Sequence, residues 1–161
     1  MKETVLEAPL VDFGELPEAI DNLLQRGVAA YRTDRVTADA LFKEALASAP
    51  QELAAYYCLY KIHTYMGNLD YAAVVARDGM KEAARQAGWS LEPTDWPPGK
   101  EAEGGPARFA LFTLKALSFI ELKRDNRQAA LDHLATLKRL DPKGSVGWTV
   151  ISELAQGIER G

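Results

Sequence analysis

The chain has 161 residues, a net charge of −4 at pH 7 and a pI of about 5.3. Its composition, 47% hydrophobic and 26% charged, is typical of a globular domain that buries its core without metal or disulfide support. The acidic balance argues against non-specific nucleic-acid binding, which needs clustered lysine and arginine. The single cysteine, Cys58, excludes an intramolecular disulfide and indicates a reducing compartment; since no signal peptide or membrane span is expected either, a cytoplasmic location follows by elimination.

The beginning of the chain, residues 1–16, shows no sustained periodicity, and we predict a poorly structured acidic leader there. It has no apolar run after a basic start, so no signal peptide is expected. No window approaches the roughly eighteen apolar residues that would span a membrane, so no membrane partner is expected. Pro17 suits the first turn of a helix, and apolar residues at spacings of three and four follow it as far as Tyr31.

Six further segments show helical spacing of apolar residues, separated by breaks rich in Gly, Asn, Asp or Pro. No segment alternates strictly between apolar and polar residues, as a half-buried strand would. The chain is therefore predicted to be all-α, with residues 17–161 forming one domain. The six segments are 38–46, ended by Pro50; 53–64; 72–80, continuing to Ala87; 109–120; 130–137, ended by Asp141-Pro142; and 146–158.

A repeat is visible in this pattern. Ala38 and Phe42, in the second predicted helix, have Ala72 and Ala76 as counterparts 34 residues later (72 − 38 = 34, 76 − 42 = 34). Two helices per 34 residues is the period of the tetratricopeptide repeat. Small residues early in the second helix allow close packing on the first, and a closing proline ends the unit. The alternative is an unrelated antiparallel bundle, which would bury the same apolar faces.

Three stretches resemble the tetratricopeptide repeat family: ADALFKEALASAP (38–50), YYCLYKIHTYMGNLDYAAVVARDGM (56–80) and LKALSFIELKRDNRQAALDHLATLKRLDP (114–142). The resemblance implies a right-handed α-solenoid of about three helix pairs with a C-terminal capping helix. It also implies a concave groove, lined by the first helix of each pair, that binds a protein or peptide. The implied groove residues are Tyr31, Arg32, Tyr57, Lys61, Thr64, Tyr65, Phe112, Lys115, Phe119 and Lys123.

Residues 88–106, GWSLEPTDWPPGKEAEGGP, interrupt the repeat: Ala72 and Ala130 are 58 residues apart, 24 more than one period (58 − 34 = 24). We interpret this segment as an inserted loop between the second and third repeat units. Trp89 and Trp96 are expected to hold its first half against the helices, covering either the protein's own core or a partner. Its second half, KEAEGGP, is polar and is expected to be mobile.

Catalytic and metal-binding patterns are missing from the sequence. His63 follows Cys58 by five residues, about 140° around a helix, so the two do not form a nucleophilic pair. No HExxH, paired CxxC, GxGxxG or P-loop motif occurs, so neither enzyme activity nor a cofactor is expected. The predicted function is a protein interaction module with no nucleic-acid partner, and self-association remains open. The alternative is a small-ligand-binding protein or enzyme whose site is closed by residues 88–106.

Overall fold

The structure is a computed structural model in which residues 14–100 and 103–160 are described, except for the side chains of 158–160. Within these residues all regular structure is helical and no strand occurs, which confirms the all-α prediction. Of the predicted leader, residues 1–13 lie outside the described part, and residues 14–16 form no helix. The chain divides into two compact units, which we call unit 1 (Met1–Ile62) and unit 2 (His63–Gly161).

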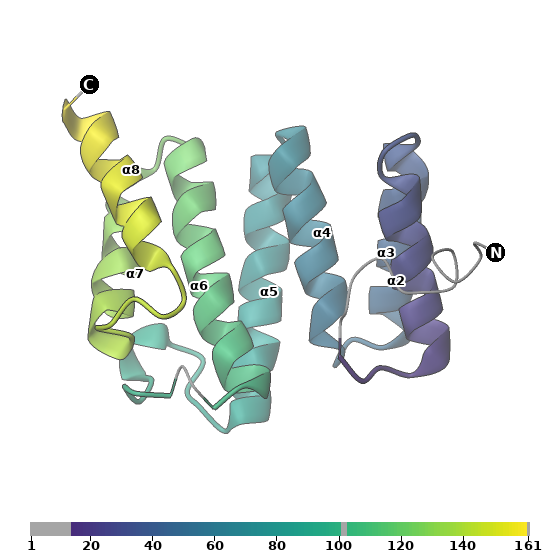
Figure 1. Cartoon of the computed structure of the whole chain (residues 1–161), viewed down its shortest axis with the longest axis horizontal. Coiled ribbons are helices and arrows are strands. Elements are labelled where there is room, and N and C mark those ends of the chain that lie inside the picture. Colours follow the sequence, from purple (N-terminus) through teal and green to yellow (C-terminus); the bar gives the residue numbers. More distant parts are fainter. Residues whose placement is uncertain (1–13, 101–102, 161) are drawn as a thin grey trace. The chain divides into compact units, whose positions relative to one another are not determined.

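Unit 1 contains α2 (Glu18–Ala30), α3 (Arg35–Ser48) and the part of α4 (Leu53–Met66) up to Ile62. Helix α3 begins three residues before the predicted start, because Asp34 caps it. The Asp34 carboxylate accepts hydrogen bonds from the Thr37 backbone N–H (3.1 Å) and from the Thr37 hydroxyl (2.6 Å). Helix α2 packs against α3, as Figure 1 shows for the purple and blue pair.

The α2–α3 contact depends on one glycine. Gly27 is buried in the middle of α2, and a Cβ built on it would overlap the ring of Phe42, which is itself buried on α3. Glycine is unfavourable inside a helix by about 1 kcal/mol relative to alanine, so propensity alone does not explain this choice. The absent side chain is what leaves room for the Phe42 ring against α2.

We therefore expect Gly27→Ala to destabilise unit 1 by about 1–3 kcal/mol, since overpacking outweighs the gain in helix propensity. The measurement is urea unfolding followed by circular dichroism at the helix band. The matched control is Gly157→Ala in α8, where an added Cβ would meet no atom within 4 Å and should stabilise the helix slightly. Equal stability of Gly27→Ala and wild type would show that Phe42 moves aside without cost.

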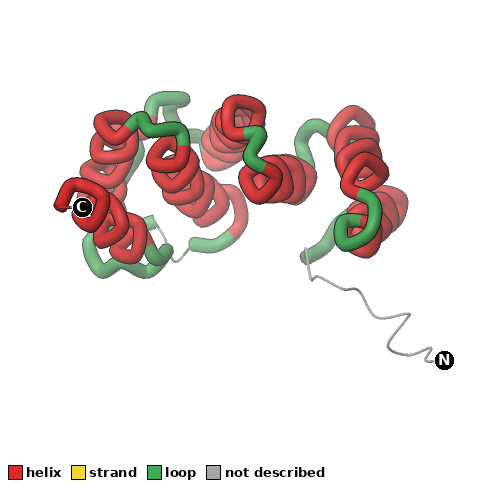
Figure 2. Tube along the Cα trace, turned by 90° about the horizontal axis from the view of Figure 1, so that it is seen from above, coloured by secondary structure: helices red, strands yellow, loops and turns green. Residues whose placement is uncertain are grey.

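Unit 2 contains α5 (Leu69–Ala87), a short 3₁₀ helix (Pro93–Asp95), α6 (Gly105–Lys123), α7 (Arg127–Leu140) and α8 (Trp148–Arg160). Helix α5 runs to Ala87, as the sequence predicts. It ends at Gly88, whose φ of 77° lets the Trp89 N–H bond to the Ala84 carbonyl at 2.8 Å. Helix α6 packs against α5, α7 and α8, and Figures 1 and 2 show it between these neighbours.

The predicted insertion, residues 88–106, is only partly a loop. Its last two residues, Gly105 and Pro106, form the first turn of α6, so the predicted boundary is two residues too late. Proline is favoured in the first turn because its missing N–H would be unpaired there in any case. Trp96 lies in the middle of the segment and is only 1% exposed. Its indole N–H donates to the Ser90 carbonyl at 2.7 Å.

Hydrogen bonds with α7 hold the first half of this segment in place. The Arg139 guanidinium donates to the backbone carbonyls of Thr94 (2.9 Å), Trp96 (3.1 Å) and Pro93 (3.4 Å), and the Gly99 N–H donates to the Leu140 carbonyl at 3.1 Å. The Pro93 carbonyl also accepts from the Trp96 N–H at 3.1 Å, so Arg139 supplements one bond inside the segment and binds two further carbonyls. The part from Gly88 to Gly99 is therefore an integral piece of unit 2, packed on α7.

The turn from α7 to α8 is built on a buried carboxylate. Asp141 accepts hydrogen bonds from the backbone N–H groups of Ser145 and Val146, both at 2.9 Å, and its own carbonyl accepts from the Trp148 indole at 2.7 Å. The sequence interpretation assigned Asp141-Pro142 only the role of ending α7. The described bonds show a second role: Asp141 positions the residues that lead into α8.

Candidate functional site

One face of α6 carries cations and aromatic rings in alternation. We call this set the α6 stripe: Arg108, Phe112, Lys115, Phe119 and Lys123. Successive members are three or four residues apart, so they share one side of the helix. Arg108 and Lys115 lie over the Phe112 ring at 4.8 and 4.7 Å from its centroid. Lys123 lies over the Phe119 ring at 5.4 Å, so every cation of the stripe is in cation–π range of a phenylalanine.

Every member of the stripe is at least partly exposed to solvent. Phe112 is 36% exposed, Lys123 is exposed, and Phe119 is partly exposed. Lys115 is half-buried, and a Cβ added to Gly147 would lie 3.4 Å from its Nζ. Burial lowers the pKa of Lys115 from its ordinary value, and the nearby charge of Arg108 lowers it further. No carboxylate in the described residues pairs with Lys115, so its charge is only partly compensated by Phe112.

Four of the groove residues predicted from the sequence, Phe112, Lys115, Phe119 and Lys123, thus lie together on α6. Arg108 was missed. The signal for it was present, because it stands four residues before Phe112, one helical turn away. The sequence interpretation began this helix at 109 and so left Arg108 outside it, whereas α6 begins at Gly105.

The predicted groove residues of unit 1 form smaller groups. On α4, Lys61 lies over the Tyr57 ring (5.2 Å to the centroid) and its Nζ donates to the Tyr57 hydroxyl at 2.9 Å. At the end of α2, Arg35 lies over the Tyr31 ring at 5.1 Å, while Arg32 is exposed. These contacts place a cation beside each tyrosine, the combination that the sequence predicts for the groove.

The remaining predicted site residues differ in accessibility. Tyr65, near the end of α4, is 65% exposed, whereas its neighbour Thr64 is buried and offers little surface to a partner. Trp96 is buried in unit 2, with the Trp89 ring 5.2 Å away, centroid to centroid. The burial of Trp96 agrees with the expectation that it anchors the first half of the 88–106 segment.

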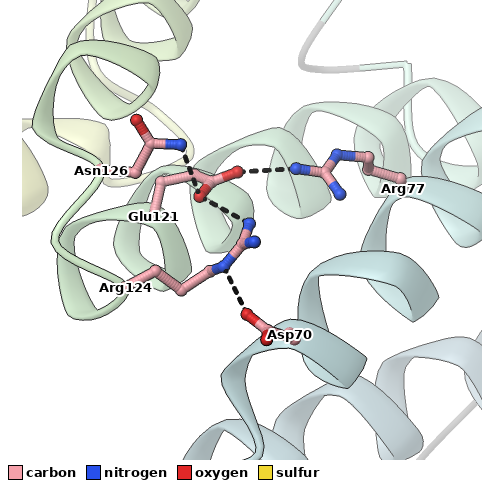
Figure 3. A network of polar contacts seen from close by, with 5 residues as sticks. All are labelled: Asp70, Arg77, Glu121, Arg124 and Asn126. Carbon is pink, nitrogen blue, oxygen red and sulfur yellow. Dashed lines mark hydrogen bonds and ion pairs between the residues drawn. The ribbon is translucent and has the colours of Figure 1, made fainter.

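Behind the α6 stripe, on the opposite side of the helix, lies a buried carboxylate. Figure 3 shows Glu121, only 1% exposed, between two arginines: Arg77 Nη2 is 2.8 Å from Oε2, and Arg124 Nη1 is 2.9 Å from Oε1. Arg124 also donates from Nε to Asp70 at 3.1 Å, and the Asn126 amide lies 3.4 Å from Glu121 Oε1. The bonds join α5 to α6 and to the turn that follows it. We call this set the Glu121 network.

The Glu121 network is a structural cluster. Both oxygens of Glu121 are occupied, and the carboxylate is closed to solvent, so it is not free to act on a ligand. His133 on α7 is affected by Glu121 and Arg77: burial lowers its pKa, Glu121 raises it and Arg77 lowers it. Burial is the largest of these effects, so the neutral form of His133 is favoured.

Other kinds of site find less support in the described residues. In residues 14–100 and 103–160, no group of three or more His, Cys, Asp or Glu side chains is arranged to hold a metal ion. A shallow depression on α8 is lined by Val150, Glu153, Leu154 and Gly157, and includes no residue of the 88–106 segment. In the same described part of the chain, no helix combines the length and apolar character that crossing a membrane requires.

The chain was also compared with known proteins. No protein-family model, no curated protein and no solved structure matches it.

Proposed function

We propose that the protein is an interaction module that binds a segment of another protein along the α6 stripe. The observation that carries this proposal is Lys115: a half-buried cation with a lowered pKa and no carboxylate partner in the described residues, between the exposed Phe112 and the partly exposed Phe119. A cation held in this way is costly unless it has a use, because burial removes hydration that no acidic partner replaces.

The stripe favours a partner that is both acidic and apolar. A carboxylate placed near Lys115 would supply the missing counter-charge, and the exposed edges of Phe112 and Phe119 would bury apolar side chains beside it. Aromatic rings give large contact area at low entropic cost, which is why they are enriched at interfaces. The partner class that matches both features is a protein segment in which acidic residues alternate with apolar ones.

A single-stranded nucleic acid fits the stripe less well. Such partners stack bases on the open faces of aromatic rings. In the α6 stripe the Phe112 ring already has Arg108 and Lys115 over it, and the Phe119 ring has Lys123. The net charge of −4 further opposes a phosphate backbone.

The alternative expected from the sequence, a small-ligand or enzyme site closed by residues 88–106, also gains little support. Polar groups in the first half of that segment bond to one another and to Arg139 of α7, and Trp96 is buried. For the fold we propose the finer architecture that the sequence resemblance implies, a right-handed tetratricopeptide-like solenoid, and we propose a cytoplasmic location from the single cysteine.

The direct test is charge reversal in the stripe. We expect Lys115→Glu to lower the recovery of partner proteins from an extract of the source cell at least about tenfold, because it places a carboxylate against the partner's acidic groups. Recovery is measured by quantitative mass spectrometry against wild type. The matched control is Lys81→Glu, a reversal at an exposed lysine on α5. Retention of every partner by Lys115→Glu would refute binding at the stripe.

A further inference from the structure

We propose that the partner segment is an amphipathic α-helix that lies along α6 and presents one acidic residue in about every two turns. This inference depends on the proposed function, since it concerns the partner of the same stripe.

The spacing of the stripe matches a second helix. Arg108 and Lys115 are seven residues apart, as are Phe112 and Phe119, and Lys123 follows eight residues after Lys115. At 1.5 Å per residue, these intervals correspond to about 10–12 Å along the axis of α6, or about two helical turns. A partner helix crossing α6 at a shallow angle returns to the same contact line at this interval, as in coiled coils. Its acidic residues would then meet successive cations, with apolar residues between them meeting the rings.

An extended peptide could also space its carboxylates by about 10 Å, so a second argument is needed. The lysine and arginine side chains of the stripe can donate hydrogen bonds, the phenylalanines cannot, and none of them offers a conventional acceptor. The stripe offers the backbone N–H groups of an extended segment no acceptor, so such a segment would have to leave them to water. A helix satisfies its own backbone and needs only side-chain contacts.

The melting temperature of a Lys115 variant distinguishes a lysine that serves binding from one that supports the fold. Because its charge is destabilised by burial and by Arg108, replacing it with methionine should leave the melting temperature unchanged or raise it. The same replacement should weaken binding of an acidic helix. A lysine that served only to support unit 2 would lower the melting temperature when replaced.

The probe is a pair of synthetic, terminally capped peptides of about twenty residues on an alanine and glutamine background. In the first, each heptad has one glutamate and one leucine a turn later, on the same face. In the second, with the same composition, the glutamates stand on the face opposite the leucines. Circular dichroism establishes equal helicity, and fluorescence anisotropy measures binding to the full chain at low and at physiological salt.

We expect the first peptide to bind about tenfold more tightly than the second, and its affinity to fall as salt rises. Lys115→Met and Lys123→Met should each weaken it about three- to fivefold, with the exposed Lys81→Met as the matched control that leaves it unchanged. Equal affinity of the two peptides would contradict the proposal that the partner is a helix with its acidic and apolar residues on one face.

The outcomes also separate this inference from the proposed function. If neither peptide binds at millimolar concentration but Lys115→Glu still loses partners from extract, the partner binds the stripe in another conformation and the helix is wrong. If neither peptide binds and Lys115→Glu keeps its partners, both proposals fail. Tighter binding of a single-stranded RNA oligonucleotide than of either peptide would also overturn both.

Discussion

Replacing Glu121 with glutamine is expected to destabilise unit 2 by about 3 kcal/mol, because it removes one side of a buried ion pair. The carboxylate is almost completely buried, and each of its oxygens accepts from a different arginine. An amide has one oxygen and no negative charge, so it pairs with Arg77 or Arg124 and turns an N–H donor toward the other. Both arginines keep some contact with solvent, and we therefore place the effect at the lower end of the range for buried pairs.

The matched control is Asp70→Asn, which removes a carboxylate from the same network. Asp70 is 92% exposed and pairs only with Arg124 among the bonds of the network, so the expected cost is below about 1 kcal/mol. Tryptophan fluorescence during urea unfolding measures both variants in unit 2 alone, since Trp89, Trp96 and Trp148 all lie within it. A Glu121→Gln cost as small as that of Asp70→Asn would show that the two arginines find other acceptors.

The network also bears on the proposed function. Glu121 and Phe119 are two residues apart on α6, about 200° around the helix, so they lie on nearly opposite sides. The ion pair between Glu121 and Arg77 of α5 therefore fixes how α6 is rotated about its own axis. In this rotation the α6 stripe lies on the side of the helix away from Glu121. We expect Glu121→Gln to weaken binding of the acidic probe peptide only to the extent that it unfolds unit 2, since Glu121 makes no contact with the stripe side chains in any bond described above.

The sequence predicts the helices of this protein well and its polar core poorly. Apolar spacing gives the positions of α2 to α8, the continuation of α5 to Ala87 and the break before α7, because each of these is a local property of the chain. Helix starts were less accurate. Helix α3 begins at Arg35, three residues before the expected start, because Asp34 caps it; apolar spacing marks only the buried face and does not include such a polar cap.

Glu121 shows why the rest could not be predicted. In the stretch FIELKRD it looks like an ordinary exposed carboxylate beside lysine and arginine. Its burial depends on Arg77, 44 residues earlier in the chain, and a single sequence carries no signal for that pairing. Arg139 is similar: it lies in a basic helix end, LKRLDP, and only the structure shows that it bonds to carbonyls more than forty residues away.

Replacing Trp96 with alanine is expected to cost unit 2 about 3–5 kcal/mol, the usual loss for a large aromatic side chain in a packed core. The ring is 1% exposed, and truncation leaves a cavity and the Ser90 carbonyl without its indole donor. Trp96→Phe separates the two effects: it keeps most of the buried area and loses the hydrogen bond, so about 1–2 kcal/mol is expected. Trp89→Ala is the matched control, since Trp89 is partly exposed and contacts the Trp96 ring.

The Trp96 result decides what the 88–106 segment does. If Trp96→Ala costs several kcal/mol and leaves the affinity of the folded protein for the acidic probe peptide unchanged, the first half of the segment is a fixed cover for the core of unit 2. The Arg139 bonds to three of its carbonyls favour that outcome, because they hold the backbone as well as the ring. If instead the cost is below about 1 kcal/mol, the buried position contributes little to folding. Trp96 would then be free to leave it at small cost, and the segment would become the better place to look for a partner contact.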